Sequence, residues 1–142
     1  MSSYEYDKDL DGINVSTRLP TLSAGEYLLS LNVVKHVEGA TGIYDIAEVT
    51  VLEGKGEDAS SGKAKISFKR DETNKMRREI KNKQIAEFLT AVAGENIESK
   101  SEFLAGLRDN PEFEGTKFRA VVTSHVAEKS KNEYKNYKFM AA

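Results

Sequence analysis

Apolar and polar residues alternate in five separate stretches of the chain, which are residues 26–37, 43–52, 63–70, 117–126 and 134–140. In residues 63–70 the apolar positions are Ala64, Ile66 and Phe68, and lysine occupies most of the positions beside them. Successive side chains of a β-strand point to opposite faces, so this alternation is typical of a strand with one buried face. The pattern therefore predicts five strands.

The first two stretches predict a long hairpin. In residues 26–37 the alternation places Leu31 and Val33 on one face, and Val34 and His36 on the opposite face. The turn residues at 39–42 then reverse the chain into the second strand. Residues 53–62 are rich in glycine, serine and acidic side chains, which predicts a polar loop before the third strand.

A helical period replaces the alternation between the third and fourth strands. Residues 85–92 carry apolar side chains at i, i+3, i+4 and i+7, and Gly94 follows as a helix stop. The helix begins either at Asn82 or further upstream, near Asp71 or Thr73. The sequence therefore predicts a helix that packs one apolar face against the strands.

A second, short helix follows the first. Ser99 and Glu102 have the spacing of a capping box, and Pro111 ends the helix that they open. Three strands, a helical region and two further strands is the element order of the OB-fold, a five-stranded, partly open Greek-key barrel. We therefore expect a mainly β domain over residues 25–142, preceded by an acidic lead-in over residues 1–24. An open, twisted α+β sheet with the same element order is the structural alternative.

Composition and charge narrow the functional classes. The 142 residues are 39% hydrophobic and 31% charged, include no cysteine, and hold no apolar run long enough to span a bilayer. The N-terminus lacks the pattern of a signal peptide, so we expect a cytoplasmic protein that does not bind membranes. The net charge of −2 is unevenly distributed, because residues 61–83 contain nine basic and three acidic residues. Such a cluster indicates a polyanion-binding face or an ordinary solvated surface.

The expected fold supplies a binding face for this cluster. OB-fold ligands cross strands 2 and 3 between the loops that join strands 1–2 and 4–5. Aromatic rings there stack on bases while cations contact phosphates, although tyrosine is also an ordinary strand residue. The basic segment Lys75–Lys81 is either an extension of this track or an exposed helix start. The candidate nucleic-acid-binding residues are Tyr44, Lys63, Lys65, Lys69, Arg70, Arg77, Arg78, Lys129, Lys131, Tyr134, Lys135, Tyr137 and Lys138.

Catalytic motifs are missing from the sequence. It contains no nucleophile elbow, phosphate-binding glycine loop or dinucleotide fingerprint, so we expect neither an enzyme nor a cofactor. Asp7–Gly12 resembles the first half of a calcium loop, but Arg18 stands where the motif requires glutamate. We therefore interpret it as an acidic lead-in that competes with nucleic acid or binds a partner protein. A nuclease or other metal-dependent enzyme that uses Asp45, Glu48 or the Asp7–Asp11 cluster is the weaker alternative.

Four segments of the chain together carry a resemblance to known proteins. The segments are Gly25–Tyr27, Ile43–Gly54, Ile80–Gly94 and Gly115–Val122. They look like the OB-fold single-stranded-DNA-binding proteins of phage replication modules. The resemblance implies sequence-independent protection of single-stranded DNA during replication or recombination in the host cytoplasm. The C-terminus, Lys138–Ala142, departs from the acidic tail of the better-known bacterial single-strand binders, which argues against partner recruitment by a C-terminal peptide.

These inferences leave several partners open. Single-stranded DNA is the expected ligand, and RNA, replication or recombination proteins and a second copy of the chain are further candidates. The rival function is a protein-interaction module, such as a replication accessory or inhibitor that uses the same barrel, because a fold does not determine a function.

Overall fold

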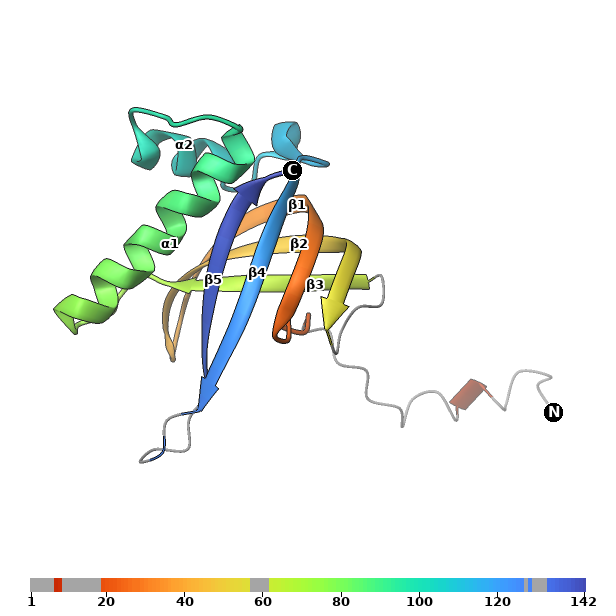
Figure 1. Cartoon of the computed structure of the whole chain (residues 1–142), viewed down its shortest axis with the longest axis horizontal. Helices are drawn as coiled ribbons and strands as arrows, with labels where there is room; N and C mark the ends of the chain where they lie inside the picture. Colours follow the sequence, from red (N-terminus) through yellow and green to blue (C-terminus); the bar gives the residue numbers. More distant parts are fainter. Residues whose placement is uncertain (1–6, 9–18, 57–61, 127, 129–132) are drawn as a thin grey trace.

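Five antiparallel strands form one sheet in the order β3-β2-β1-β4-β5 (Figure 1). The computed structural model describes residues 7–8, 19–56, 62–126, 128 and 133–142. The strands are β1 (Gly25–Gly39), β2 (Gly42–Gly56), β3 (Gly62–Lys69), β4 (Lys117–Val126) and β5 (Glu133–Ala141). Two α-helices, α1 (Lys75–Ala93) and α2 (Lys100–Leu107), and a short 3-10 helix, η2 (Pro111–Phe113), lie between β3 and β4. The chain is therefore mainly β, with an antiparallel sheet whose two edges are β3 and β5.

The alternation along β1 changes at an irregularity in its pairing with β2. The register shifts between Leu31 and Val33, so that Val34 is buried and Val33 only half-buried. A bulge of this kind adds a residue to one strand and exchanges the faces of all the residues that follow. The predicted alternation is wrong beyond this point. As a result, His36 lies beside Asp45, the residue opposite it on β2.

Strand β2 is longer than its alternation predicted. Residues 53–56, expected to begin a loop, continue the strand and pair with residues 25–28 at the start of β1. A neighbouring strand that offers unpaired backbone groups draws even a glycine-rich segment into the ladder. The remainder of the predicted loop, residues 57–61, lies outside the described residues.

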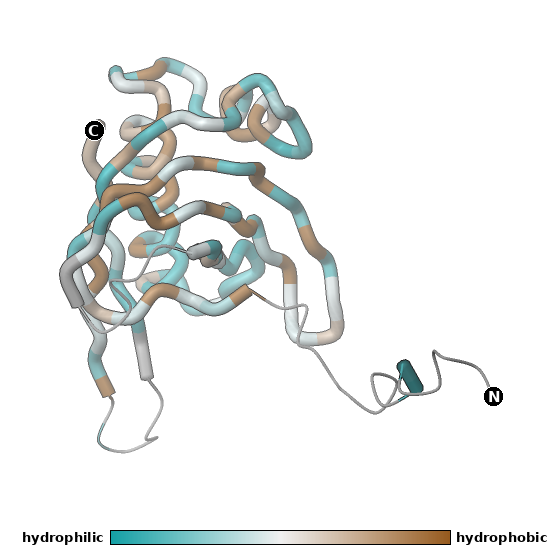
Figure 2. The backbone as a smooth tube through the Cα atoms, turned by 90° about the vertical axis from the view of Figure 1, so that its right-hand side faces the viewer, coloured by the Kyte–Doolittle hydropathy of each residue, from teal (hydrophilic) through white to brown (hydrophobic). Residues whose placement is uncertain are grey.

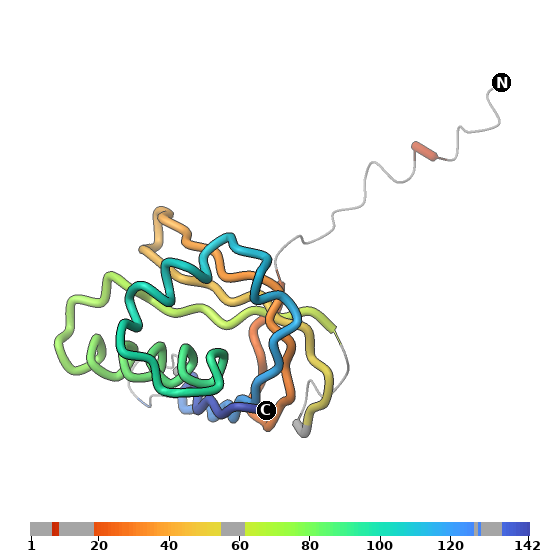
Figure 3. The backbone as a smooth tube through the Cα atoms, turned by 90° about the horizontal axis from the view of Figure 1, so that it is seen from above, coloured from red at the N-terminus to blue at the C-terminus, as the bar shows by residue number. Residues whose placement is uncertain are grey.

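Phenylalanine side chains from one helix and three strands form the centre of the core. The ring of Phe88 on α1 lies 5.4 Å, centroid to centroid, from each of Phe68 on β3, Phe118 on β4 and Phe139 on β5. Figure 2 shows hydrophobic and hydrophilic positions alternating along the strands, and Figure 3 shows α1 lying along one side of them. Helix α1 therefore holds both edge strands of the sheet to the same aromatic cluster.

The helix boundaries follow local hydrogen bonding. The side chain of Asn74, not that of Asn82, caps α1 by accepting from the backbone N–H of Arg77. Gly94 ends α1 with φ of 77°, a left-handed conformation that glycine adopts without steric cost. Ser99 caps α2 by accepting from the N–H of Glu102, as the predicted capping box requires.

The segment after α2 completes the pairing of β1. Strand β4 pairs only with residues 25–30 of β1, which leaves the second half of β1 without a strand on that side. There the N–H groups of Asp109 and Gly115 donate to the carbonyls of Val34 and Leu31, each at 2.8 Å. The segment between α2 and β4 thus covers an edge that β4 does not reach.

Part of the acidic lead-in packs between the two edge strands. The N–H of Lys65 on β3 donates to the carbonyl of Pro20 at 2.9 Å. Lys135 on β5 donates from Nζ to the Leu22 carbonyl at 2.7 Å and to Thr21 Oγ1 at 2.9 Å. The Leu22 side chain is 1% exposed. Residues 20–22, which we call the strap, therefore link β3 to β5 without a direct strand pairing.

Candidate nucleic-acid interface

The outward face of β2 and β3 gathers four of the predicted binding residues, Tyr44, Lys63, Lys65 and Lys69. Tyr44 lies directly opposite Lys69 in the strand pairing, and Lys65 and Lys63 lie opposite Glu48 and Thr50. Neighbouring positions on both strands are buried, so the alternation turns these four side chains outward. We call Tyr44, Lys63, Lys65 and Lys69 the basic face.

One acidic residue lies within the basic face. The Glu48 carboxylate is opposite Lys65 and forms an ion pair of 3.3 Å with Lys35 on β1. The Lys35 side chain is 51% exposed and that of Glu48 27%, so solvent weakens the pair and it contributes little to stability. Because Lys35 offsets the charge of Glu48, the three lysines of β3 still give this face a positive excess.

A cavity of about 600 Å³ opens beside the basic face. Segments that are far apart in the sequence form its walls, and they come from the strap, β3, the start of α1 and β5. The residues around it are Thr21, Ser67, Glu72, Arg77, Ile80, Lys81, Lys135, Asn136 and Tyr137. Ser67 lies between Lys65 and Lys69 on β3, so this cavity adjoins the basic face. We call it the seam cavity. It brings Arg77, Lys135 and Tyr137 together, which no local pattern in the sequence predicted.

Lys81 is a cavity residue that the candidate list omits. Its side chain is half-buried, and this burial lowers the pKa of its ammonium group, an effect that the nearby Glu72 carboxylate partly offsets. Within the described part of the chain, no ion-pair partner lies against it. The basic run from Lys75 to Lys81 identified Lys81 in the sequence as part of a positive segment. That Lys81 lies on the side of α1 that faces the cavity depends on how the helix packs.

Two of the four predicted residues of β5, Lys135 and Tyr137, have structural contacts of their own. Tyr137 is only 6% exposed and stacks on Phe139 with ring centroids 5.9 Å apart, so its ring does not lie on an open face as expected. Lys135 holds the strap, as described above. Both therefore shape the wall of the seam cavity rather than an exposed stacking platform.

Apart from Arg70, the remaining candidates divide into two groups. Lys138 and Arg78 are exposed, on β5 and α1 respectively, and neither lies on the basic face or lines the seam cavity. Lys129 and Lys131 lie outside the described residues, as does the side chain of Tyr134. Arg70, the last candidate, forms a buried contact.

Arg70 belongs to a network around the buried carboxylate of Asp45. Asp45 is 1% exposed, and Arg70 NH1 contacts its Oδ2 at 2.6 Å. Arg108, at the end of α2, binds both carboxylate oxygens, with Nε to Oδ1 and NH2 to Oδ2 each at 2.9 Å. His36 Nδ1 lies 2.9 Å from Oδ1. This network joins β1, β2, the end of β3 and α2, and it gives Arg70 a structural contact in place of the expected phosphate contact.

The network changes how its members titrate. Burial by itself raises the pKa of Asp45, but hydrogen bonds from Arg108, His36 and Arg70 together lower that pKa below its ordinary value. The hydrogen bonds to Asp45 and Glu38 raise the pKa of His36 above its ordinary value of 6.5. Asp45 is therefore ionised at neutral pH. Asp45 serves as a structural anchor, because its buried carboxylate binds Arg70, Arg108 and His36.

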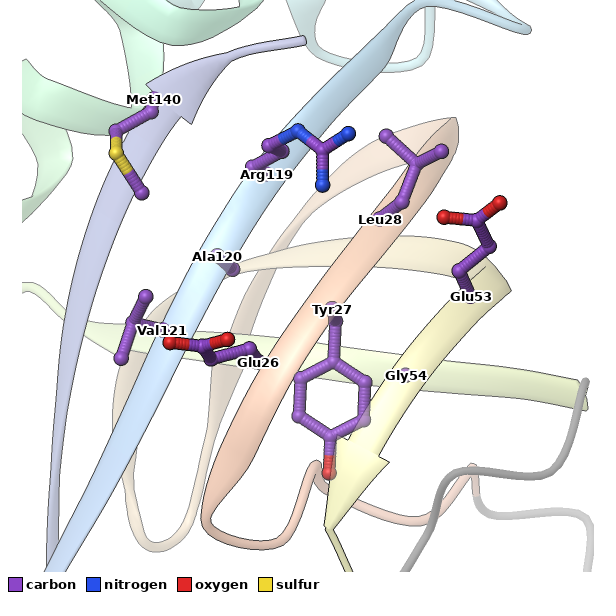
Figure 4. Close-up of a pocket in the computed structure, with 9 residues that line it drawn as sticks. All are labelled: Glu26, Tyr27, Leu28, Glu53, Gly54, Arg119, Ala120, Val121 and Met140. Carbon is purple, nitrogen blue, oxygen red and sulfur yellow. The ribbon is translucent and has the colours of Figure 1, made fainter.

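A second concave surface lies on the outer side of the sheet (Figure 4). Its volume is about 260 Å³, and it contains one cross-strand row that runs from Glu53 through Leu28 and Arg119 to Met140. Figure 4 shows Glu53 and Arg119 on opposite sides of Leu28, with Glu26 nearby. We call this surface the mixed groove. Its two carboxylates make it a poorer match for a polyanion than the basic face.

Comparisons with known proteins add no relative. No protein-family model matches the sequence, and no curated protein matches it. Within the described residues, no helix has the length and apolar character needed to cross a membrane, and no group of three or more histidine or acidic residues could hold a metal ion. The chain's own surfaces therefore carry the information on what the protein binds.

Removing the Asp45 carboxylate should destabilise the fold. Asp45→Ala leaves the guanidinium groups of Arg70 and Arg108 without their common partner, and we expect the free energy of unfolding to fall by about 3 kcal/mol. Urea unfolding followed by circular dichroism measures this loss. Glu48→Ala, which breaks an exposed pair, is the control and should cost less than about 1 kcal/mol. Equal losses in the two variants would contradict the anchoring role of Asp45.

His36 should make stability depend on pH. Because its pKa is raised on folding, the stabilisation is complete below about pH 6.5 and is lost as the pH rises through the folded-state value. We expect unfolding midpoints in urea to fall as the pH rises above about 6.5, and His36→Gln to remove most of this fall. His125→Gln, at the only other histidine and on an exposed position of β4, should leave the fall unchanged. A pH dependence that survives in His36→Gln would refute this role.

Proposed function

We propose that the protein is a non-catalytic, OB-fold-like binder of single-stranded DNA that contacts phosphates and bases largely without regard to sequence. The observation that carries the proposal is the alignment of Tyr44 with three lysines on the outer face of β2 and β3, beside a cavity that is itself basic. The resemblance to phage single-strand binders is consistent with protection of DNA during replication or recombination.

The strand order supports the OB-like part of the proposal. A five-stranded barrel of this type has β1 between β2 and β4, with a helix between β3 and β4, and the sheet order β3-β2-β1-β4-β5 agrees with that arrangement. The edges β3 and β5 are bridged here by the strap and by α1. In such barrels ligands cross strands 2 and 3, which is where the basic face lies.

The chemistry of the basic face suits a single strand. Lysines at alternate positions of β3 follow one direction along the strand, and a flexible polyanion can track them with successive phosphates. Tyr44 is half-buried beside them, and its hydroxyl contacts the Thr41 carbonyl at 3.3 Å, which orients the ring. One aromatic ring beside a row of cations favours base stacking together with phosphate contact, a combination that does not depend on sequence.

The mixed groove favours a second candidate function, binding of a partner protein. Leu28, Val121 and Met140 leave apolar surface there, and Arg119 lies close to two glutamates with which it forms no ion pair in the described part of the chain. Exposed apolar surface flanked by both signs of charge is typical of protein interfaces. This groove is separate from the basic face, so the two functions can be tested independently.

Charge reversal tests the DNA-binding proposal. Fluorescence anisotropy with a labelled dT oligonucleotide of about 30 nucleotides should give salt-sensitive binding that is stronger than binding to a duplex. Lys63→Glu, Lys65→Glu and Lys69→Glu combined should weaken it by about tenfold or more and flatten its salt dependence.

The control variant carries three charge reversals as well, but at positions outside the basic face. Lys83→Glu, Lys117→Glu and Arg119→Glu lie at exposed positions of α1 and β4, and together they should have a much smaller effect. Matched single-stranded RNA in the same assay measures discrimination between the nucleic acids. Wild-type protein that binds none of these ligands would overturn the proposal and leave the partner-protein function as the better one.

Tyr44 should contribute by stacking. Tyr44→Ala is expected to weaken binding to the dT oligonucleotide by about 1–3 kcal/mol, the usual contribution of one stacked base. Tyr44→Phe keeps the ring and loses only the hydroxyl, so its affinity should stay close to that of the wild type. Equal affinities of the alanine and phenylalanine variants would show that Tyr44 does not stack.

A further inference from the structure

We propose that the seam cavity is a binding pocket for a terminal phosphate monoester, which takes the phosphorylated end of the strand that the basic face binds. The idea rests on the proposed function for the bound strand, but the pocket itself is argued from its own geometry and charge. Its volume of about 600 Å³ is within the range of small-molecule sites.

The charge of the seam cavity matches a dianion. Arg77, Lys81 and Lys135 line it, and Glu72 is the acidic residue among the residues that form its walls, which leaves an excess of two positive charges. A phosphate monoester carries about −1.5 to −2 charges near neutral pH, whereas an internal phosphodiester carries one negative charge. The excess therefore favours the end of a strand over its middle.

Among the residues that line the seam cavity, Lys81 is the one whose surroundings most favour a bound anion. Its ammonium group is half-buried at the cavity wall and has no ion pair among the described residues, although burial of a cation without a partner is unfavourable. The Glu72 carboxylate, also on the cavity wall, already accepts from the N–H of Asn74, the residue that caps α1. Lys81 therefore remains the cavity cation that a bound phosphate would pair with.

Polar groups and continuity with the basic face complete the match. Thr21, Ser67 and Asn136 place two hydroxyls and one amide on the walls, and these can donate to the three terminal oxygens of a monoester. Ser67 stands between Lys65 and Lys69, so the cavity opens beside the row of lysines, and the end of a strand bound along that row can turn into it. The strap supplies one wall, because Lys135 holds Thr21 in place.

The test compares oligonucleotide ends. Labelled dT oligonucleotides of about 8 nucleotides, short enough for the end to matter, carry a phosphate at the 5′ end, at the 3′ end or at neither. We expect one phosphorylated end to bind about tenfold more tightly than the hydroxyl form. Lys81→Met, which keeps most of the side-chain length, should abolish this preference and change the affinity for the hydroxyl form less than about twofold.

Two further variants separate loss of charge from loss of fold. Lys81→Arg retains the cation and should retain the preference, and Lys83→Met changes a lysine of the same helix that does not line the seam cavity and should also retain it. Circular dichroism of each variant establishes that it is folded. Loss of the preference in Lys83→Met as well as in Lys81→Met would overturn the assignment to Lys81.

A second ligand distinguishes failure of the pocket from failure of the proposed function. In an NMR titration with thymidine 5′-monophosphate, we expect shifts of the Ser67 and Asn136 amide signals that Lys81→Met abolishes. Equal binding of all three oligonucleotides would overturn the pocket and leave the proposed function standing. Nucleotide binding without oligonucleotide binding would support the pocket and overturn the proposed function, and no binding of either ligand would overturn both.

Discussion

The ion pairs of the Asp45 carboxylate are the interactions on which the attachment of α2 and of the end of β3 to the sheet depends. This carboxylate is buried on β2, and its charge is acceptable there because Arg70, Arg108 and His36 surround it. Each partner comes from a different element, so one side chain joins β1, β2, the end of β3 and α2. The contact with Arg108 also holds the segment after α2 where its backbone pairs with β1. Without this anchor, both the end of α2 and the chain leaving β3 would lose their common attachment.

A second constraint comes from the two edge strands of the sheet, β3 and β5, which do not pair with each other. Strands β3 and β5 are not neighbours in the sheet, and the strap and α1 lie between them instead. Leu22 and Phe88 fill the interior at this seam, while cations remain on its outer side. The same geometry that protects the edges creates a cavity next to a row of lysines. The candidate site is therefore a consequence of how the sheet is completed.

Two surfaces of opposite character follow from this arrangement. The basic face and the seam cavity carry a positive excess and suit a polyanion, whereas the mixed groove carries both signs of charge around an apolar centre. Among the described residues, Glu48 is the acidic residue that lies opposite a lysine of the basic face, and Lys35 offsets its charge. A net charge of −2 for the whole chain therefore says little about what either surface binds.

Local sequence determined the elements themselves: the five strands, the cap of α2 at Ser99 and the outward lysines of β3 could be predicted, because alternation and capping act between residues close in the chain. Tertiary structure alone decided the rest. The bulge in β1 placed His36 beside Asp45. The same buried carboxylate gave Arg70, an expected phosphate contact, a structural contact. Burial of Tyr137 and the meeting of Lys81 with Ser67 and Thr21 depend on how α1 and the strap pack between β3 and β5. Those contacts join residues far apart in the sequence, and no local pattern of apolar and polar positions encodes which distant side chain will fill a given space.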